Sequence, residues 1–188
     1  MKKVFMIHGF QGRPNEGWRP WLMSKLAHAK VWACALAMPK ADNPNKDEWV
    51  KEIERMIEKP NKDIFLVGHS LGVPTILNYL QSLPTGASIG GVILVSGPVR
   101  ILPAIIFRPI HHFMDTPFDF EHIKKVCKKF SVIHGDNDSL VPFKHAVELS
   151  EDLGCELISV HGGGHLNEES DCYELPEALE AFKKMGVI

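Results

Sequence analysis

Short apolar runs alternate along this chain with longer amphipathic segments, and this alternation restricts the folds open to it. Each run is bounded by glycine, proline or polar residues and is apolar at most consecutive positions. That pattern is typical of strands buried on both faces of a parallel sheet. The predicted strands are Val4–Ile7, Val31–Ala37, Ile64–Val67, Val92–Val95, Phe130–Ile133 and Glu156–Val160.

Between the runs, apolar residues recur at the three- and four-residue spacing of helices, which predicts packing against a sheet. Proline and glycine support two of these helices. Pro142 suits the first turn of one helix and Gly154 its C-terminal cap, while Pro176 lies near the start of the last. The apolar stripes are Trp18–Leu26, Trp49–Ile57, Val73–Leu83, Ala146–Leu153 and Ala178–Met185.

Strands that alternate with helices predict βαβ units with right-handed crossovers. The expected fold class is therefore α/β, a three-layer α/β/α sandwich with about six mostly parallel strands. The 188 residues suit one domain spanning 1–188. A chain of this size can bury a substantial core without disulfides or metals.

Composition excludes several classes of function. The net charge of −2 gives no electrostatic reason to expect nucleic acid or a membrane surface as partner. No stretch approaches the length of a membrane-spanning helix. The four cysteines lie far apart with no C-x-x-C, so we expect free thiols and a cytoplasmic location. No set of His and Asp residues has ligand spacing on one element, so we expect neither a metal nor another cofactor.

One five-residue motif stands where chemistry is expected, after a strand of the predicted parallel sheet. Gly68-His69-Ser70-Leu71-Gly72 has the form G-x-S-x-G and lies between the third predicted strand and a helical stripe. This context is typical of a nucleophile elbow, a strained turn that lifts the serine above the sheet. The serine also lies at a helix N-terminus, which favours developing negative charge. We predict Ser70 as a nucleophile and interpret His69 as structural.

A serine hydroxyl needs a base, and the base needs an orienting acid. Two later loops offer candidates for both roles. Asp136 and Asp138 follow the fifth predicted strand, and Asp136 is also plausible as a turn former. His161 and His165 follow the sixth strand, and the glycines between them let the chain turn back toward Ser70. We favour His165 as the base, because His161 lies at the strand end with less freedom to reach inward.

Two backbone donors are expected to stabilise the oxyanion of a tetrahedral intermediate. Leu71 N–H directly follows the nucleophile, and Phe10 N–H lies in the Gly-rich loop after the first strand. The alternative is that Gly9 and Gly12 only shape a turn. If Phe10 contributes its backbone, its side chain lines the acyl pocket.

The chain resembles the small serine hydrolases of the YdeN and retinoblastoma-binding-protein type, within the α/β-hydrolase superfamily. The matching stretches span nearly the whole chain and keep the order of the family. They are Ile7-His8-Gly9 with Trp18 and Trp21, Met38-Pro39, Trp49, Gly68–Gly72, Val95-Ser96-Gly97, Phe118-Asp119-Phe120 with Ile123, Val141-Pro142 and Gly163-Gly164-His165.

The resemblance implies a minimal α/β-hydrolase fold with no large cap domain. The pattern HG-x-x-D-x-x-VP resembles the acid loop of these hydrolases and selects Asp138 over Asp136. Transferred by motif, the implied triad is Ser70, Asp138 and His165. The His-Gly pair after the first strand resembles the oxyanion loop of the superfamily.

An apolar segment, residues 98–121, follows the fourth strand and is expected to border the site. It could form a small lid over an acyl chain or simply pack on its own domain. Arg100 and Arg108 could meet a substrate carboxylate, although solvated surface charge is the plainer interpretation.

These features predict a serine hydrolase, an esterase-like enzyme that acts on small acyl substrates through an acyl-enzyme. A peptidase or a thioesterase would use the same residues. A different hypothesis is a hydrolase-fold protein that binds a protein partner and has little turnover.

Overall fold

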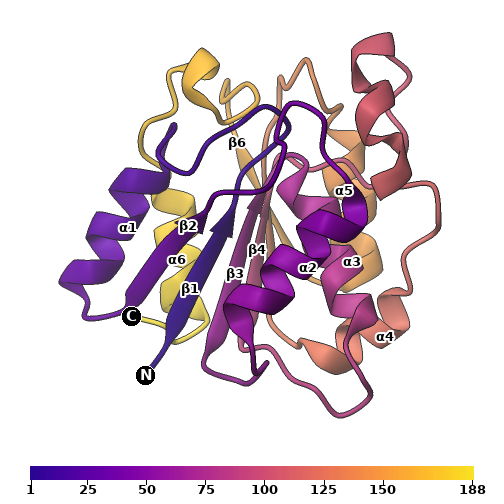
Figure 1. Cartoon of the computed structure of the whole chain (residues 1–188). Helices are drawn as coiled ribbons and strands as arrows, with labels where there is room; N and C mark the ends of the chain where they lie inside the picture. Colours follow the sequence, from indigo (N-terminus) through magenta and orange to yellow (C-terminus); the bar gives the residue numbers. More distant parts are fainter.

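The computed structural model describes residues 1–188 and contains a six-stranded parallel sheet between two layers of helices (Figure 1). The predicted three-layer α/β/α fold is confirmed. The strands are β1 (Lys3–Ile7), β2 (Trp32–Leu36), β3 (Ile64–His69), β4 (Gly91–Val95), β5 (Phe130–Gly135) and β6 (Glu156–Val160). The helices are α1 (Arg19–His28), α2 (Lys46–Ile57), α3 (Gly72–Ser82), α4 (Phe120–Val126), α5 (Lys144–Leu153) and α6 (Pro176–Lys184), with short 3₁₀ segments η1 (Ile105–Phe113) and η2 (Glu168–Ser170).

The strand order is β2-β1-β3-β4-β5-β6, and every neighbouring pair is parallel. The chain runs outward from β1 to β2 and then crosses to the other side of β1 to form β3. Ligands of such sheets bind in the crevice where the strand order reverses, at the carboxyl ends of the strands. The topology therefore predicts a ligand site at the loops that follow β1 and β3, at the top of Figure 1.

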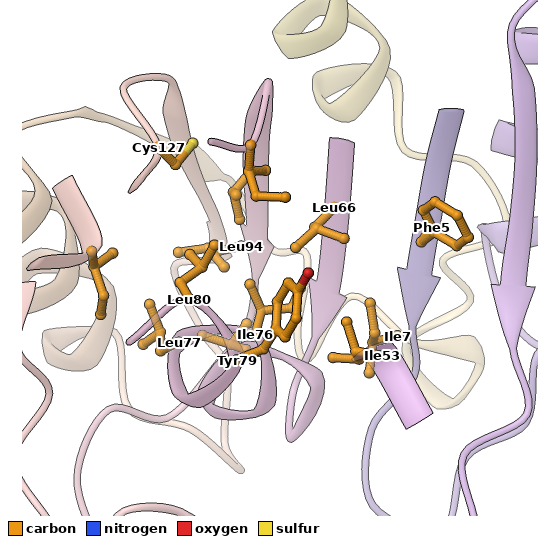
Figure 2. Close-up of a cluster of buried hydrophobic side chains, with 14 of the residues drawn as sticks. Phe5, Ile7, Ile53, Leu66, Ile76, Leu77, Tyr79, Leu80, Leu94 and Cys127 are labelled. Atoms are coloured by element: carbon orange, nitrogen blue, oxygen red, sulfur yellow. The ribbon is translucent and has the colours of Figure 1, made fainter. Parts of the chain in front are cut away.

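Alternate side chains of each strand enter different cores on the two faces of the sheet. On one face, Phe5, Leu66 and Leu94 of three strands belong to a core that includes Ile76 and Leu80 of α3, and Figure 2 shows Leu66 and Leu94 nearer than Phe5 to the α3 side chains. Helices α2, α4 and α5 complete this layer. The apolar residues of the predicted α3 stripe, Val73, Ile76, Leu77, Leu80 and Leu83, are all buried, as expected for a helix that packs on the centre of the sheet.

The opposite face carries a smaller core built on α1 and α6. Trp18 and Leu22 of the α1 region and Phe182 of α6 pack on strand residues such as Met6 and Val67. The Trp18 indole also donates a hydrogen bond to the Leu166 carbonyl, 2.9 Å away. This contact joins the start of α1 to the loop that carries His165.

The structure corrects two sequence predictions and confirms two others in detail. The edge strands β2 and β6 are only partly buried, because each has a neighbour on one side alone. Pro142 precedes α5 by two residues instead of lying in its first turn. Gly154 caps α5 in the left-handed conformation with φ of 65°, and Pro176 is the first residue of α6, as predicted.

Candidate active site

Ser70 lies in the tight turn between β3 and α3. Its φ is 52°, a left-handed conformation that is strained for a residue with a side chain. A Cβ on Gly9 would lie 2.9 Å from the Cβ of Ser70, closer than real contacts allow. Glycine at position 9 therefore lets the loop after β1 pass directly beside the serine.

Asp138 and His165 come together from the loops that follow β5 and β6. The distance from His165 Nδ1 to Asp138 Oδ2 is 2.8 Å. The Asp138 side chain is fully buried and that of His165 is 8% exposed. The other carboxylate oxygen, Oδ1, accepts hydrogen bonds from the backbone N–H groups of Leu140 and Val141, at 2.9 and 3.0 Å.

This environment keeps Asp138 ionised. Burial alone would raise the pKa of Asp138, but hydrogen bonds from His134, His165 and the Val141 N–H outweigh it and lower the pKa. An ionised Asp138 can only accept, so Nδ1 of His165 carries the proton. His165 Nε2 is then the lone-pair nitrogen, and His165 lines the same cavity as Ser70.

No hydrogen bond joins the Ser70 hydroxyl to His165 in the structure. The backbone of His165 is held separately, since its N–H donates to Ser170 Oγ at 3.1 Å and its carbonyl accepts from His69 Nε2 at 2.9 Å. Nε2 of His165 has no hydrogen-bond partner, so it is free to accept a hydrogen bond from the Ser70 hydroxyl. Hydrogen bonds between a nucleophile and its base often tighten only when substrate is bound.

His134 is a member of this site that the sequence analysis did not single out. Its Nε2 lies 3.2 Å from Asp138 Oδ2 and 2.9 Å from the Val141 carbonyl. The side chain is 1% exposed. The available signal was its position four residues before Asp138, across the turn that ends β5.

Two further histidines, His8 and His69, are buried beside the site and hydrogen-bond to its backbone. Burial lowers the pKa of His8, whose Nδ1 donates to the Gly9 carbonyl at 2.8 Å. His8 Nε2 accepts from the Met38 N–H, so the ring is neutral. Burial, together with the charges of His165 and Arg19, lowers the pKa of His69 well below its usual range.

The alternative acid and base also meet each other, at the molecular surface. Asp136 Oδ2 lies 2.7 Å from His161 Nδ1, and the His161 side chain is 99% exposed. Asp136 Oδ1 accepts from the Gly162 N–H at 2.8 Å. Neither Asp136 nor His161 lines the cavity that contains Ser70.

The two predicted oxyanion donors have free N–H groups. Neither Phe10 N–H nor Leu71 N–H takes part in a hydrogen bond within the chain. Neighbouring donors are used: Gln11 N–H donates to Ala41 and Ser70 N–H donates to the Val95 carbonyl. One free N–H directly follows the nucleophile and the other lies in the loop that passes beside it, so both suit the stabilisation of a developing negative charge.

A cavity of about 700 Å³ opens at Ser70 and His165 and has two different ends. The apolar end is formed largely by the segment 98–121 and by residues after β5. The polar end is formed by the start of α1 and by the η2 region. The apolar end comprises Leu102, Ile106, Phe107, Pro109, Ile110, Leu140 and Val141, and the polar end Glu16, Arg19, Asn167, Glu168 and Glu169.

The segment 98–121 both lines this cavity and packs on the domain. Phe113 is buried and its ring lies 5.7 Å from that of Trp49, edge to face. Ile105 and Ile106 of η1 remain 75% and 60% exposed. Whether the segment moves as a lid stays a prediction.

The cations that the sequence singled out do not reach the cavity. Arg100 forms an ion pair with Glu148 at 2.6 Å, and Arg108 is exposed. Neither lines the cavity, whereas Arg19 does.

No group of three His, Cys, Asp or Glu side chains is arranged to hold a metal ion. None of the helices is both long and apolar enough to cross a membrane.

Comparisons with known proteins agree on one family. The profile of the family described as serine hydrolase matches residues 4–184. YdeN of Bacillus subtilis strain 168, named as a hydrolase, is 33% identical over 175 residues, which cover 93% of this chain and 91% of that protein. The crystal structure of the B. subtilis ydeN product superposes with a TM-score of 0.94 and 31% identity, over 100% of both chains.

More distant structures share the fold. Est1E from Butyrivibrio proteoclasticus superposes with a TM-score of 0.72 at 18% identity, over 98% of this chain and 86% of the other. A monoacylglycerol lipase from Paleococcus ferrophilus gives 0.69 at 17% identity, over 99% and 95%. The family profile and the YdeN relationship together place this chain in the serine hydrolase family.

Proposed function

We propose that this protein is an esterase-like hydrolase of small acyl substrates that works through an acyl-enzyme on Ser70. His165 is the general base and general acid, and Asp138 is its orienting acid. The observation that carries the proposal is the buried Asp138–His165 hydrogen bond of 2.8 Å, with His165 lining the same cavity as Ser70.

The first half of the reaction forms an ester on the enzyme. Ser70 Oγ attacks the carbonyl carbon of the substrate, and His165 Nε2 takes the proton of the hydroxyl. The carbonyl π electrons move onto oxygen, giving a tetrahedral oxyanion. When the intermediate collapses, the bond to the leaving alcohol breaks and His165 returns the proton to that alcohol.

The second half repeats these steps with water. Water adds to the acyl carbon as His165 takes its proton, and collapse releases the carboxylic acid and restores the Ser70 hydroxyl. Asp138 stays ionised throughout and stabilises the imidazolium, which its lowered pKa supports. The free N–H groups of Phe10 and Leu71 are the proposed donors to the oxyanion in both halves.

Small substrates suit the dimensions of the site. A cavity of about 700 Å³ lies in the range of pockets for small molecules. Its apolar end fits a short hydrocarbon group. An ester is the simplest substrate for these groups, because its carbonyl is less resonance-stabilised than that of an amide and an alkoxide leaves more readily than an amide anion.

The test is turnover of short-chain p-nitrophenyl esters by the wild type and by Ser70→Ala. We expect the wild type to release p-nitrophenol and the variant to fall to the background rate, because no other residue replaces the nucleophile. Circular dichroism controls for folding of the variant. Equal turnover by both proteins would refute the proposal.

Negligible turnover by the folded wild type on esters, thioesters and peptides alike would instead support the binding-protein hypothesis. A protein partner captured equally by the wild type and by Ser70→Ala would then be expected.

A further inference from the structure

The first residue of α1 is a buried cation at the polar end of the cavity. Arg19 is 4% exposed and lines the cavity together with Ser70 and His165. Its guanidinium lies over the ring of Trp18, 5.8 Å from the ring centre. The Trp18 ring in turn meets the ring of His69 edge to face, at 6.1 Å. One aromatic ring, that of Trp18, therefore lies between the Arg19 guanidinium and His69, the residue before Ser70.

The polar contacts of Arg19 are fewer than a buried guanidinium needs. One Nη2 hydrogen bond goes to the Arg13 carbonyl at 2.8 Å. The nearest carboxylate oxygen, on Glu16, is 3.8 Å away, beyond hydrogen-bond distance. Nε is buried and has no partner. Because a guanidinium has five N–H donors and buried donors are normally satisfied, this side chain is prepared for an acceptor that the chain does not supply.

The position of Arg19 in the helix adds a second positive element. Helix α1 has ten residues, no acidic residue in its first turn and no side-chain cap at Trp18. Its N-terminus therefore presents the positive end of the helix dipole where the guanidinium lies. Anions bind at such termini, and Gly17 and Arg19, on either side of this one, line the cavity.

Four carboxylates line the cavity with Arg19, but only that of Glu16 comes within 4 Å of the guanidinium. Glu16 contacts Arg19 and is shared with Arg13, also at 3.8 Å. Glu168 attracts the guanidinium from η2, but desolvation by burial is the larger effect and lowers the pKa of Arg19. Glu168, Glu169 and Asp42 are exposed at the cavity lining, where solvent and salt screen them.

We propose that Arg19 binds a carboxylate on the substrate, so that the preferred ester has an apolar part at the segment 98–121 and a carboxylate at the start of α1. The inference rests on the proposed function and adds the class of substrate. A planar guanidinium fork matches a carboxylate. The exposed carboxylates of Glu168, Glu169 and Asp42 repel any anion. Because this repulsion grows with the charge of the ligand, they disfavour a singly charged carboxylate less than a doubly charged phosphate.

The experiment compares matched esters that differ only by a carboxylate. Monoethyl adipate is paired with ethyl hexanoate, which tests a carboxylate on the acyl side. The pair 3-butanoyloxypropanoate and propyl butanoate tests the alcohol side. We expect the wild type to favour the anionic member of at least one pair in kcat/KM. Arg19→Gln should reduce that preference about 10- to 100-fold, as expected for a lost charge-assisted hydrogen bond.

Arg13→Gln is the matched control. Arg13 has a side chain that is 69% exposed, meets the same Glu16 and does not line the cavity, so its loss should leave the preference unchanged. Arg19→Lys should restore part of the preference, because it keeps the charge but not the fork.

Thermal unfolding separates binding from a structural role. A cation kept for substrate should be neutral or destabilising to the empty protein, so Arg19→Gln should leave Tm unchanged or raise it. A lower Tm with equal loss on both members of each pair would assign Arg19 a structural role and overturn the inference. So would a wild type with no preference in either pair. Retained turnover in Ser70→Ala would instead refute the proposed function, which keeps the two failures distinct.

Discussion

Two Asp–His pairs join the same two loops of this protein, and they differ chiefly in burial. Asp138 and His165 meet at 2.8 Å with side chains 0% and 8% exposed. Asp136 and His161 meet at 2.7 Å with side chains 35% and 99% exposed. Distance alone would not distinguish a catalytic pair from a surface contact.

The surroundings of the two pairs explain what burial adds. The inner carboxylate receives further hydrogen bonds from His134, Leu140 and Val141, so its direction and ionisation are fixed. The second oxygen of the outer carboxylate accepts a hydrogen bond from the Gly162 N–H and so stabilises the glycine turn. In water, an exposed pair contributes little energy, whereas a buried and fully bonded carboxylate can orient a base. The outer pair therefore stabilises the turn at Gly162, in the loop that carries His165 of the inner pair.

The largest expected effect is a difference in kcat between variants of His165 and of His161. We expect His165→Gln to reduce kcat for a short-chain p-nitrophenyl ester by about 10⁴-fold or more, because no base then takes the Ser70 proton. His161→Gln should stay within a few-fold of the wild type, since its side chain points into solvent. Steady-state kinetics on both variants checks this. A comparable loss in the two variants would remove the distinction between the pairs.

A smaller effect concerns stability and pH. Burial lowers the pKa of His8 and His69, so both rings stay neutral in the folded protein at pH values where the unfolded chain binds protons. The unfolded state then holds more protons below about pH 6.5, and the free energy of unfolding falls as the pH drops through that value. Denaturant unfolding at pH 7.5 and pH 5 should show this decrease.

Two variants sharpen the pH experiment. His69→Gln should reduce the decrease by roughly 1–2 kcal/mol, the amount one buried neutral histidine contributes over this range. His161→Gln, with its exposed side chain, is the control and should leave the decrease unchanged. A free energy of unfolding that is flat between pH 7.5 and pH 5 would contradict the assignment of neutral buried rings.

The sequence predicted the sheet and the turn at Ser70 because both depend on local patterns. Apolar runs and the spacing of Gly68 and Gly72 around Ser70 are visible in the printed chain. His134 and Arg19 were missed as site residues for the opposite reason. Arg19 belongs to no motif, and although His134 is the first residue of the HG-x-x-D-x-x-VP pattern, its contact with Asp138 depends on how the turn after β5 folds. The plainer interpretation of Arg100 as surface charge agrees with its exposed ion pair to Glu148 of α5, a partner that the sequence alone does not indicate.

We propose that the inner pair, Asp138 and His165, activates Ser70. The rate of covalent labelling by a fluorophosphonate, with the labelled peptide located by mass spectrometry, measures this in the wild type, Asp138→Asn and Asp136→Asn. We predict a single label on Ser70, a rate lower by about 10²–10³-fold in Asp138→Asn, and an unchanged rate in Asp136→Asn. A label on another residue, or equal slowing in both variants, would contradict the account.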